Sequence, residues 1–261
     1  MRPVFKCHGG KFYLAPWVIS QFPQPLPDVY LEPFCGAGSV VLNKPRSVLE
    51  VVNDIDPGVI SIYRALRDRT YDFISRLRSL TYCEGTFAYA LQKVEFTDNF
   101  DRAVNEYILR RMSRGGLKTA FSWSKRLRGG RPGDVNGWVT AIAGLPQLAD
   151  RLHGVCIYNG QAVDVIRNFD TKDVLHYCDP PYLSSVRTAK KAYAYEMTDA
   201  QHTALAGVLR NCKGKVIISG YKSYLYDRLY EGWNTVEKEV ANHSSQAKNK
   251  ARRVEVLWKN Y

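Results

Sequence analysis

Five consecutive residues, Cys178 to Tyr182, combine groups suited to holding an amino group on a flat ring. The segment reads Cys-Asp-Pro-Pro-Tyr and follows a predicted buried strand, and ligands of open α/β sheets bind at the carboxyl ends of strands. Asp179 supplies a carboxylate, and the two prolines leave carbonyl acceptors in a stiff, extended backbone. Tyr182 adds an aromatic face for stacking. These groups suit the exocyclic amine of a nucleobase, although an isolated Asp-Pro-Pro-Tyr is more often a simple turn.

A glycine-containing turn follows another predicted strand, 29–32. Phe34, Gly36 and Gly38 lie in the sequence Pro-Phe-Cys-Gly-Ala-Gly-Ser, after which a helix is predicted to begin. Small residues in such a turn let the main chain approach a nucleotide closely. Val41 stands where the dinucleotide fingerprint has its third glycine, which disfavours an NAD-dependent oxidoreductase. An adenosine-like cofactor is therefore the expected ligand.

Three acidic residues and one lysine are further candidates. Asp54 ends the predicted strand 47–52, where an acid can accept hydrogen bonds from ribose hydroxyls. Asp56 precedes a proline and an apolar helical pattern, so it is predicted to cap a helix. Asp164 follows a later strand and either meets the cofactor or caps a short helix. Lys11 follows two glycines and either points its charge toward a ligand or lies on the surface.

A long segment, residues 70–153, interrupts the alternation of strands and helices. Helices are predicted near 71–80, 84–95, 99–112 and 136–152. No acidic residue occurs from 107 to 133, and aromatic residues lie among the cations. We expect these cations to contact phosphate groups, with a solvated basic face as the alternative. The cations are Arg110, Arg111, Arg114, Lys118, Lys125, Arg126, Arg128 and Arg131.

Composition narrows the classes of partner. The formal net charge of +12 indicates a polyanion, most simply nucleic acid. The chain has no run of eighteen apolar residues and its N-terminus lacks the apolar core of a signal peptide, so no membrane contact is expected and the protein should be intracellular. The six cysteines lie far apart without zinc-site spacing, which favours reduced thiols and no metal.

The order of these motifs resembles the Dam-type DNA adenine methyltransferases, the alpha group that carries Asp-Pro-Pro-Tyr. The resemblance runs from about residue 5 to the terminal segment 253–258. It implies an α/β fold, a Rossmann-like methyltransferase sheet with an antiparallel C-terminal hairpin and a helical insertion. The implied domains are a catalytic domain, 1–69 plus 154–261, and a target-recognition insertion, 70–153.

The resemblance also implies the reaction and the site. The enzyme would be a site-specific methyltransferase, of a restriction-modification system or of another kind, that uses S-adenosylmethionine and no metal. It would act as a cytoplasmic monomer on an adenine flipped out of double-stranded DNA, in a bacterial or phage-infected cell. The implied catalytic residues are Asp179, Pro180, Pro181 and Tyr182. The implied cofactor-binding residues are Lys11, Phe34, Gly36, Gly38, Asp54, Asp164 and Asp179.

Four alternatives stay open beside this expectation. The same chemistry can act on the 4-amino group of cytosine, although by family resemblance such enzymes more usually begin the motif with serine. RNA adenine and a glutamine side chain are possible substrates, and the basic insertion argues against protein. A DNA-binding protein that has lost catalysis belongs to a different class, which the intact motif disfavours.

Overall fold

The computed structural model describes residues 1–7, 9–128, 130–187, 193–241 and 252–261. The chain forms two compact units, each built from several separate segments. Unit 1 comprises Met1–Gln21, Cys35–Pro45 and Asp56–Asn159. Unit 2 comprises Phe22–Phe34, Arg46–Ile55 and Gly160–Tyr261.

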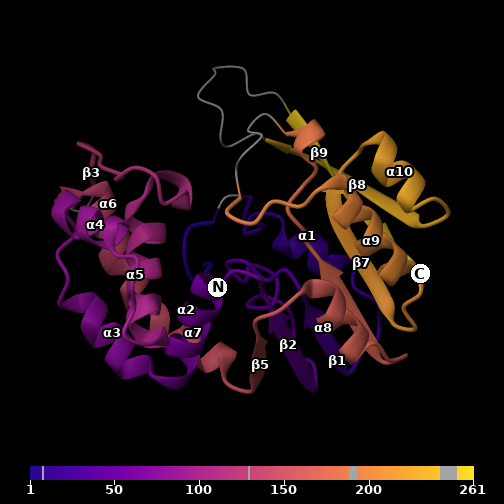
Figure 1. The fold of residues 1–261 in the computed structure, drawn as a ribbon, viewed down its shortest axis with the longest axis horizontal. Coiled ribbons are helices and arrows are strands. Elements are labelled where there is room, and N and C mark those ends of the chain that lie inside the picture. The colour runs from indigo at the N-terminus through magenta and orange to yellow at the C-terminus, as the bar shows by residue number, and fades with distance from the viewer. Residues whose placement is uncertain (8, 129, 188–192, 242–251) are drawn as a thin grey trace. The chain divides into compact units, whose positions relative to one another are not determined.

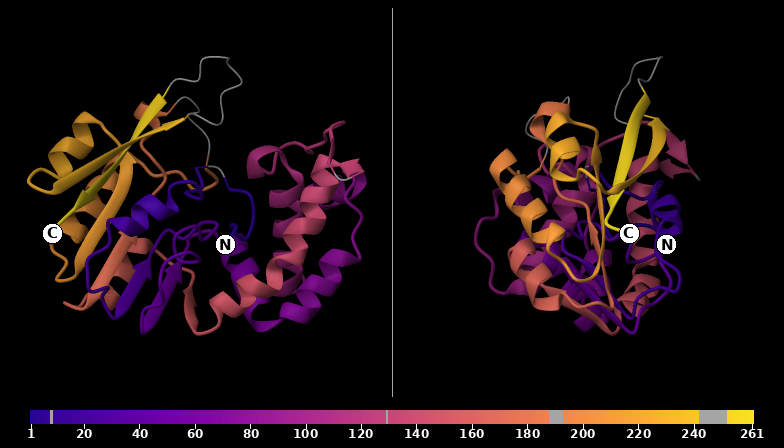
Figure 2. Two further views of the ribbon diagram at one scale, coloured as in Figure 1. Left: turned by 180° about the vertical axis from the view of Figure 1, so that it is seen from behind. Right: turned by 90° about the vertical axis from the view of Figure 1, so that its right-hand side faces the viewer.

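One seven-stranded sheet has the order β5-β2-β1-β6-β7-β9-β8. Its strands are β1 (Val29–Glu32), β2 (Leu49–Asn53), β5 (Val155–Tyr158), β6 (Val174–Cys178), β7 (Lys215–Tyr221), β8 (Asn234–Ala241) and β9 (Arg252–Lys259). The neighbours β2, β1, β6 and β7 are parallel, whereas β9 is antiparallel to both β7 and β8. The terminal β8–β9 hairpin lies beside β7 (Figure 2). This mixed sheet with a C-terminal antiparallel hairpin confirms the fold predicted from the sequence.

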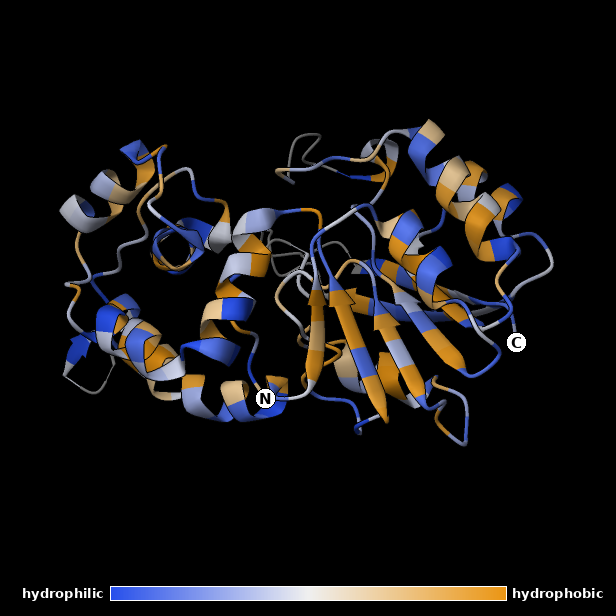
Figure 3. Cartoon of the chain, turned by 60° about the horizontal axis from the view of Figure 1, so that its bottom comes forward, coloured by the Kyte–Doolittle hydropathy of each residue, from blue (hydrophilic) through white to orange (hydrophobic). Residues whose placement is uncertain are grey.

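Hydrophobic residues dominate the central strands, and the helices of unit 2 alternate between hydrophobic and hydrophilic residues (Figure 3). All five residues of β6 are buried, as expected of a parallel strand covered on both faces. The helices of unit 2 are α8 (Ala162–Phe169), α9 (Asp199–Arg210) and α10 (Tyr224–Leu229), with a 3-10 turn η2 (Ser184–Val186). Helices α8 and α9 lie against the same face of the sheet (Figure 1). A capping box formed by Thr198 and Gln201 begins α9.

Unit 1 is mainly helical. Its helices are α1 (Ala15–Ser20), α2 (Pro57–Asp68), α3 (Thr70–Arg78), α4 (Glu84–Gln92), α5 (Asn99–Met112), α6 (Gly133–Ala143) and α7 (Leu145–Leu152). A 3-10 turn, η1 (Arg114–Gly116), and a short hairpin of β3 (Leu127–Arg128) and β4 (Arg131–Pro132) lie between α5 and α6. Helix α5 packs against α2, α3, α4 and α6. Among the described residues, none of the helices is long and apolar enough to cross a membrane.

Two of the predicted helices differ in the structure: one is divided into two helices and the other does not form. The helix predicted over 136–152 is two helices, because α6 ends at Gly144 and Pro146 begins a new first turn. No α-helix begins at Val40; the chain there makes successive turns, and Pro45 prevents their extension. The two compact units have other boundaries than the predicted domains. Unit 1 includes α2, which lies before the predicted insertion 70–153, because α2 packs on α5.

Candidate active site

The carboxyl ends of β2, β1 and β6 form one edge of unit 2. These three strands are adjacent and parallel, so the residues that follow them emerge side by side. Asp54 follows β2, Phe34 follows β1 and Asp179 follows β6. The structure thus gathers three of the predicted site residues at this edge, and each of them is partly exposed.

A buried asparagine links the segments at this edge. The side chain of Asn53, at the end of β2, donates to the carbonyl oxygens of Pro33 and Gly160, both at 3.0 Å. Its oxygen accepts from the backbone N–H of Gly160 at 2.9 Å. These bonds fix the backbone directly before Phe34 and Asp54. Asn53 is not among the site residues predicted from the sequence, although its place at a strand end directly before Asp54 is a usable signal.

The carboxylate of Asp179 is held by a residue of the neighbouring strand. The hydroxyl of Ser219, on β7, donates to Asp179 Oδ1 at 2.8 Å, and its oxygen lies 3.3 Å from the carbonyl oxygen of Cys178. Ser219 is fully buried, so water does not compete for this hydrogen bond. The motif therefore leaves the sheet with a carboxylate whose orientation is set before any ligand binds.

The side chain of Tyr182 is almost entirely enclosed, with 5% of its surface exposed. Its hydroxyl donates to Oε1 of Glu255 on β9. Its ring meets the ring of Tyr221 edge-on, with centroids 4.8 Å apart. Burial, followed by the charge of Glu255, raises the pKa of Tyr182 well above its usual range. The phenol therefore keeps its proton and remains a donor.

Ser219 and Glu255 are not among the site residues predicted from the sequence. Both lie in segments predicted as strands, 215–219 and 253–258, and both are polar residues among apolar ones. Buried polar groups in strands are uncommon unless they are hydrogen-bonded, so their presence was a usable signal. The partner of each, however, depends on the order of strands in the sheet.

The glycine turn and Lys11 belong to unit 1. Gly36 and Gly38 both have positive φ values, 47° and 73°. A Cβ at Gly38 would collide with the hydroxyl of Tyr63, so packing alone requires glycine there. A Cβ at Gly36 would have only Cys7 Sγ nearby, at 3.9 Å, so this glycine leaves open space for a ligand. Lys11 is buried, and its ammonium group donates to the carbonyl oxygen of Gly9 at 3.3 Å.

The two remaining acids have different roles. Asp56 accepts from the backbone N–H of Gly58 at 2.8 Å at the start of α2, which confirms the predicted cap. Asp164 lies in the first turn of α8, largely exposed, 3.4 Å from Arg167. No side chain caps α8, so the capping alternative for Asp164 is wrong.

Three of the eight predicted phosphate-contacting cations are engaged within unit 1. Arg110 is buried, 2.6 Å from Asp56 and 3.2 Å from Glu106. The ammonium group of Lys118 lies 3.1 Å from Glu106. Arg111 donates to two backbone carbonyls near the N-terminus at 2.9 and 3.3 Å. These contacts favour a structural role for Arg110, because a buried cation between two carboxylates cannot reach a phosphate without breaking them.

The other cations lie on the surface of unit 1. Arg114, Lys125, Arg126 and Arg131 are exposed, and the side chain of Arg128 lies outside the described part of the structure. Trp123 is 61% exposed, whereas Phe121 packs against Tyr82 and Phe87. The two aromatic residues of the basic segment thus differ: Phe121 stabilises the helical unit and Trp123 faces solvent.

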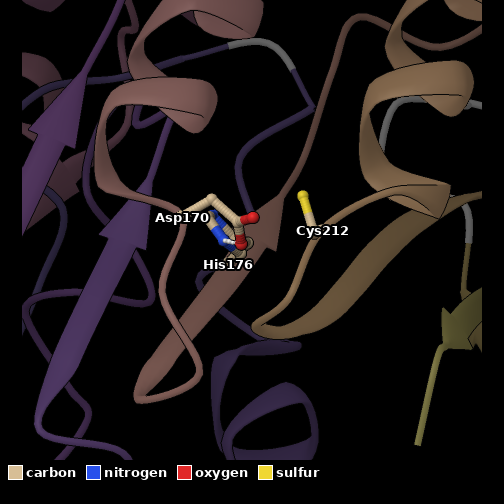
Figure 4. A group of neighbouring side chains, drawn as sticks. All are labelled: Asp170, His176 and Cys212. Atoms are coloured by element: carbon tan, nitrogen blue, oxygen red, sulfur yellow. Dashed lines mark hydrogen bonds and ion pairs between the residues drawn. The ribbon is translucent and has the colours of Figure 1, made fainter.

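A cluster in unit 2 brings together Asp170, His176 and Cys212 (Figure 4), whose ligand-type atoms lie within 4.8 Å of one another. Asp170, after α8, accepts from the backbone N–H groups of Lys213 and Gly214 at 2.9–3.0 Å and lies 3.3 Å from His176 Nε2. Burial and Asp170 raise the pKa of Cys212 to about 12, so its thiol stays protonated. These hydrogen bonds account for the cluster as a tie between the loops before β6 and β7.

Comparison with known proteins identifies relatives along most of the chain. A model of the D12 class N6 adenine-specific DNA methyltransferase family matches residues 8–243. A DNA adenine methylase of Salmonella typhi is 30% identical over 241 residues, which cover 88% of this chain and 84% of that protein. The DNA adenine methylase of Escherichia coli K12 is 28% identical with the same coverage. That of Haemophilus influenzae is 25% identical over 98% of this chain and 91% of its own length.

Among solved structures, the rRNA methyltransferase aviRa of Streptomyces viridochromogenes is 11% identical, with a TM-score of 0.46 over all of this chain and 88% of its own. That likeness is too weak to support an argument about substrate. The family match and the relatives confirm the resemblance seen in the motifs. The chain therefore belongs to the D12 class N6 adenine-specific DNA methyltransferase family, so its substrate is DNA and its reaction is the methylation of adenine with S-adenosylmethionine.

Proposed function

We propose that Asp179, Pro180, Pro181 and Tyr182 bind the target adenine and direct its 6-amino group for methylation. The observation that carries this proposal is the carboxylate of Asp179, fixed by the buried hydroxyl of Ser219 at the carboxyl end of β6. The carboxylate of Asp179 and the carbonyl of Pro180 accept hydrogen bonds from the two amino hydrogens. Tyr182 stacks on the base once the groups that cover its ring, which is 5% exposed in this structure, move aside.

The two acceptors matter because the amine is a poor nucleophile. Its lone pair is conjugated into the purine ring, which keeps the nitrogen planar. Acceptors aimed at both hydrogens favour a pyramidal nitrogen, whose lone pair is available to attack. Asp179 need not be a strong base, since the nitrogen becomes acidic only as the new N–C bond forms. A carboxylate held in advance lowers the barrier through alignment and electrostatics.

We further propose that the cofactor is held by Lys11, Phe34, Gly36, Gly38, Asp54, Asp164 and Asp179. S-adenosylmethionine supplies a methyl group bonded to a sulfonium sulfur. Gly36 fits such a ligand, because its positive φ and the open space at its Cβ position allow close approach of the backbone. Asp54, directly after β2, fits a ribose acceptor. Gly38 is needed for packing against Tyr63 in any case, so it is weaker support.

The exposed cations of the basic segment are proposed to contact DNA phosphates. Arg114, Lys125, Arg126 and Arg131 are the described members with exposed side chains. Phosphate contacts position a protein on the duplex without reading its sequence. The adenine amine of duplex DNA is inaccessible, so the base must be flipped out at a cost of a few kcal/mol. We also propose that the enzyme is cytoplasmic and acts as a monomer. Sedimentation of the pure protein tests its oligomeric state.

The catalytic assignment is tested by two matched variants that flank β6. Asp179→Ala should lower the single-turnover rate of DNA methylation by at least about 10²-fold, because it removes a preorganised acceptor. Asp173→Ala removes an exposed carboxylate before the same strand and should leave the rate unchanged. DNA affinity, measured by fluorescence anisotropy without cofactor, should match wild type in both. An Asp179→Ala enzyme with the wild-type rate would exclude the proposed role.

A further inference from the structure

The terminal hairpin reaches the motif tyrosine through one buried acid. Strand β9 pairs with β7 so that Glu255 lies opposite Tyr221, beyond the point where β6 ends. Glu255 is 2% exposed, while its neighbour Val254 faces outward with 37% exposed. Oε1 of Glu255 accepts the hydrogen bond from the hydroxyl of Tyr182.

We propose that Glu255 is a positioning residue, which sets the orientation of the Tyr182 ring that stacks on the flipped base. The proposal rests on the stacking role of Tyr182 in the proposed function. The C-terminal hairpin thereby has a second task, because β9 both pairs with β7 in the sheet and supplies the acceptor that holds the ring.

The geometry leaves the ring few other ways to be fixed. Pro180 and Pro181 restrain the backbone before Tyr182, so the remaining freedom lies in rotation of the side chain. The hydrogen bond to Glu255 fixes the far end of that side chain, and Tyr221 packs edge-on against its ring at 4.8 Å. The guanidinium of Arg253 lies 5.3 Å from the Tyr221 ring and supports it in turn. A Tyr182 ring that is already oriented loses less conformational freedom when the base binds.

Ordinary packing is the competing explanation, since a buried carboxylate needs a donor wherever it lies. The two explanations differ for a pair of apolar substitutions. Replacing both partners of a buried hydrogen bond by apolar groups of similar shape is often nearly neutral for stability. A Tyr182→Phe, Glu255→Leu double variant should therefore fold, yet it has no bond to hold the ring.

The experiment compares single-turnover methylation at saturating DNA and cofactor in five variants. Glu255→Leu should lower the rate about tenfold or more, because a misplaced reacting group can cost up to roughly 10²-fold. Glu255→Gln, which keeps an acceptor oxygen, should recover most of the rate. Tyr182→Phe should match Glu255→Leu, and the double variant should be no slower than either. Glu237→Gln, an exposed acid of β8, is the matched control and should behave as wild type.

Three outcomes would overturn the proposal. A double variant that regains both its melting temperature and the wild-type rate would show that Glu255 serves packing alone. Additive losses in the double variant would show that Glu255 acts on something other than the Tyr182 hydroxyl. Glu255→Gln as slow as Glu255→Leu would show that charge, not the hydrogen bond, matters. Tyr182→Ala keeps the tests separate, because a normal rate in that variant refutes the stacking role of Tyr182 itself.

Discussion

Arg110 offers a sharp test of which basic residues stabilise the protein and which bind DNA. Its guanidinium lies between Asp56 and Glu106 and 4.8 Å from the ring of Phe5. Asp56 also caps α2, so the arginine joins α5 to the start of α2. The Arg110→Ala substitution should therefore unfold unit 1 more easily rather than weaken DNA binding selectively.

The size of the effect follows from burial. The side chains of Arg110, Asp56 and Glu106 are 7%, 13% and 14% exposed, so water can replace little of what the guanidinium supplies. Removing one partner of a buried ion pair costs about 3–5 kcal/mol. For a chain of this size, that loss lowers the melting temperature by about 6–20 °C. Arg110→Lys keeps the charge but not the two-pronged geometry, so an intermediate loss is expected.

The assay measures melting by circular dichroism, and it measures DNA affinity by fluorescence anisotropy at a temperature below the unfolding transition of both proteins. Arg126→Ala is the comparison, since Arg126 is exposed in the same basic segment. It should melt within about 2 °C of wild type, as most surface substitutions do, but bind DNA more weakly. An Arg110→Ala protein that melts like wild type and loses affinity as Arg126→Ala does would show that Arg110 binds DNA rather than stabilising unit 1.

Three further predictions follow from other contacts. Ser219→Ala should slow single-turnover methylation by up to roughly 10²-fold through loss of the bond to Asp179, with DNA affinity in the absence of cofactor unchanged by anisotropy; an unchanged rate would show that the bond to Ser219 does not matter for the reaction. Arg126→Ala should reduce the slope of log K against log salt for DNA by about 0.9, and an unchanged slope would deny it a phosphate contact. Burial lowers the pKa of His202 from 6.5 to about 4, so the folded protein favours the neutral ring. As the pH falls from 6.5 to 4, the unfolded chain binds the proton first, and the free energy of unfolding drops by about 3 kcal/mol. Denaturant titrations should show this loss reduced in His202→Phe; equal losses in both proteins would contradict it.

Strand-level features of the fold could be predicted because they depend on local pattern. The apolar run before Cys178 and the two terminal strands are long enough and apolar enough to be found in the sequence, and Asp56 with Pro57 marks a helix start unambiguously. Where local signals conflict, prediction failed: Val40 and Val41 suggest a helix, and Pro45 prevents it. Gly144 and Pro146 are an equally local signal for the break between α6 and α7.

The partners of site residues could not be predicted in the same way. Glu255 meets Tyr182 only because β9 inserts between β7 and β8, and sequence order does not state that arrangement. The number of cations in the basic segment overstated how many can contact phosphate, for a similar reason. Arg110 and Lys118 both pair with Glu106, which lies just outside the acid-free span. Arg110 also pairs with Asp56, which lies far from that span in sequence.

One experiment tests whether this chain methylates the 6-amino group of adenine in DNA through Asp179. The most direct measurement incubates the purified protein with radiolabelled S-adenosylmethionine and unmodified duplex DNA, digests the DNA to nucleosides and identifies the labelled one. We expect label in 6-methyladenine for wild type and none for Asp179→Ala. Label in cytosine would contradict the base assignment, and label in RNA but in no DNA would contradict the substrate.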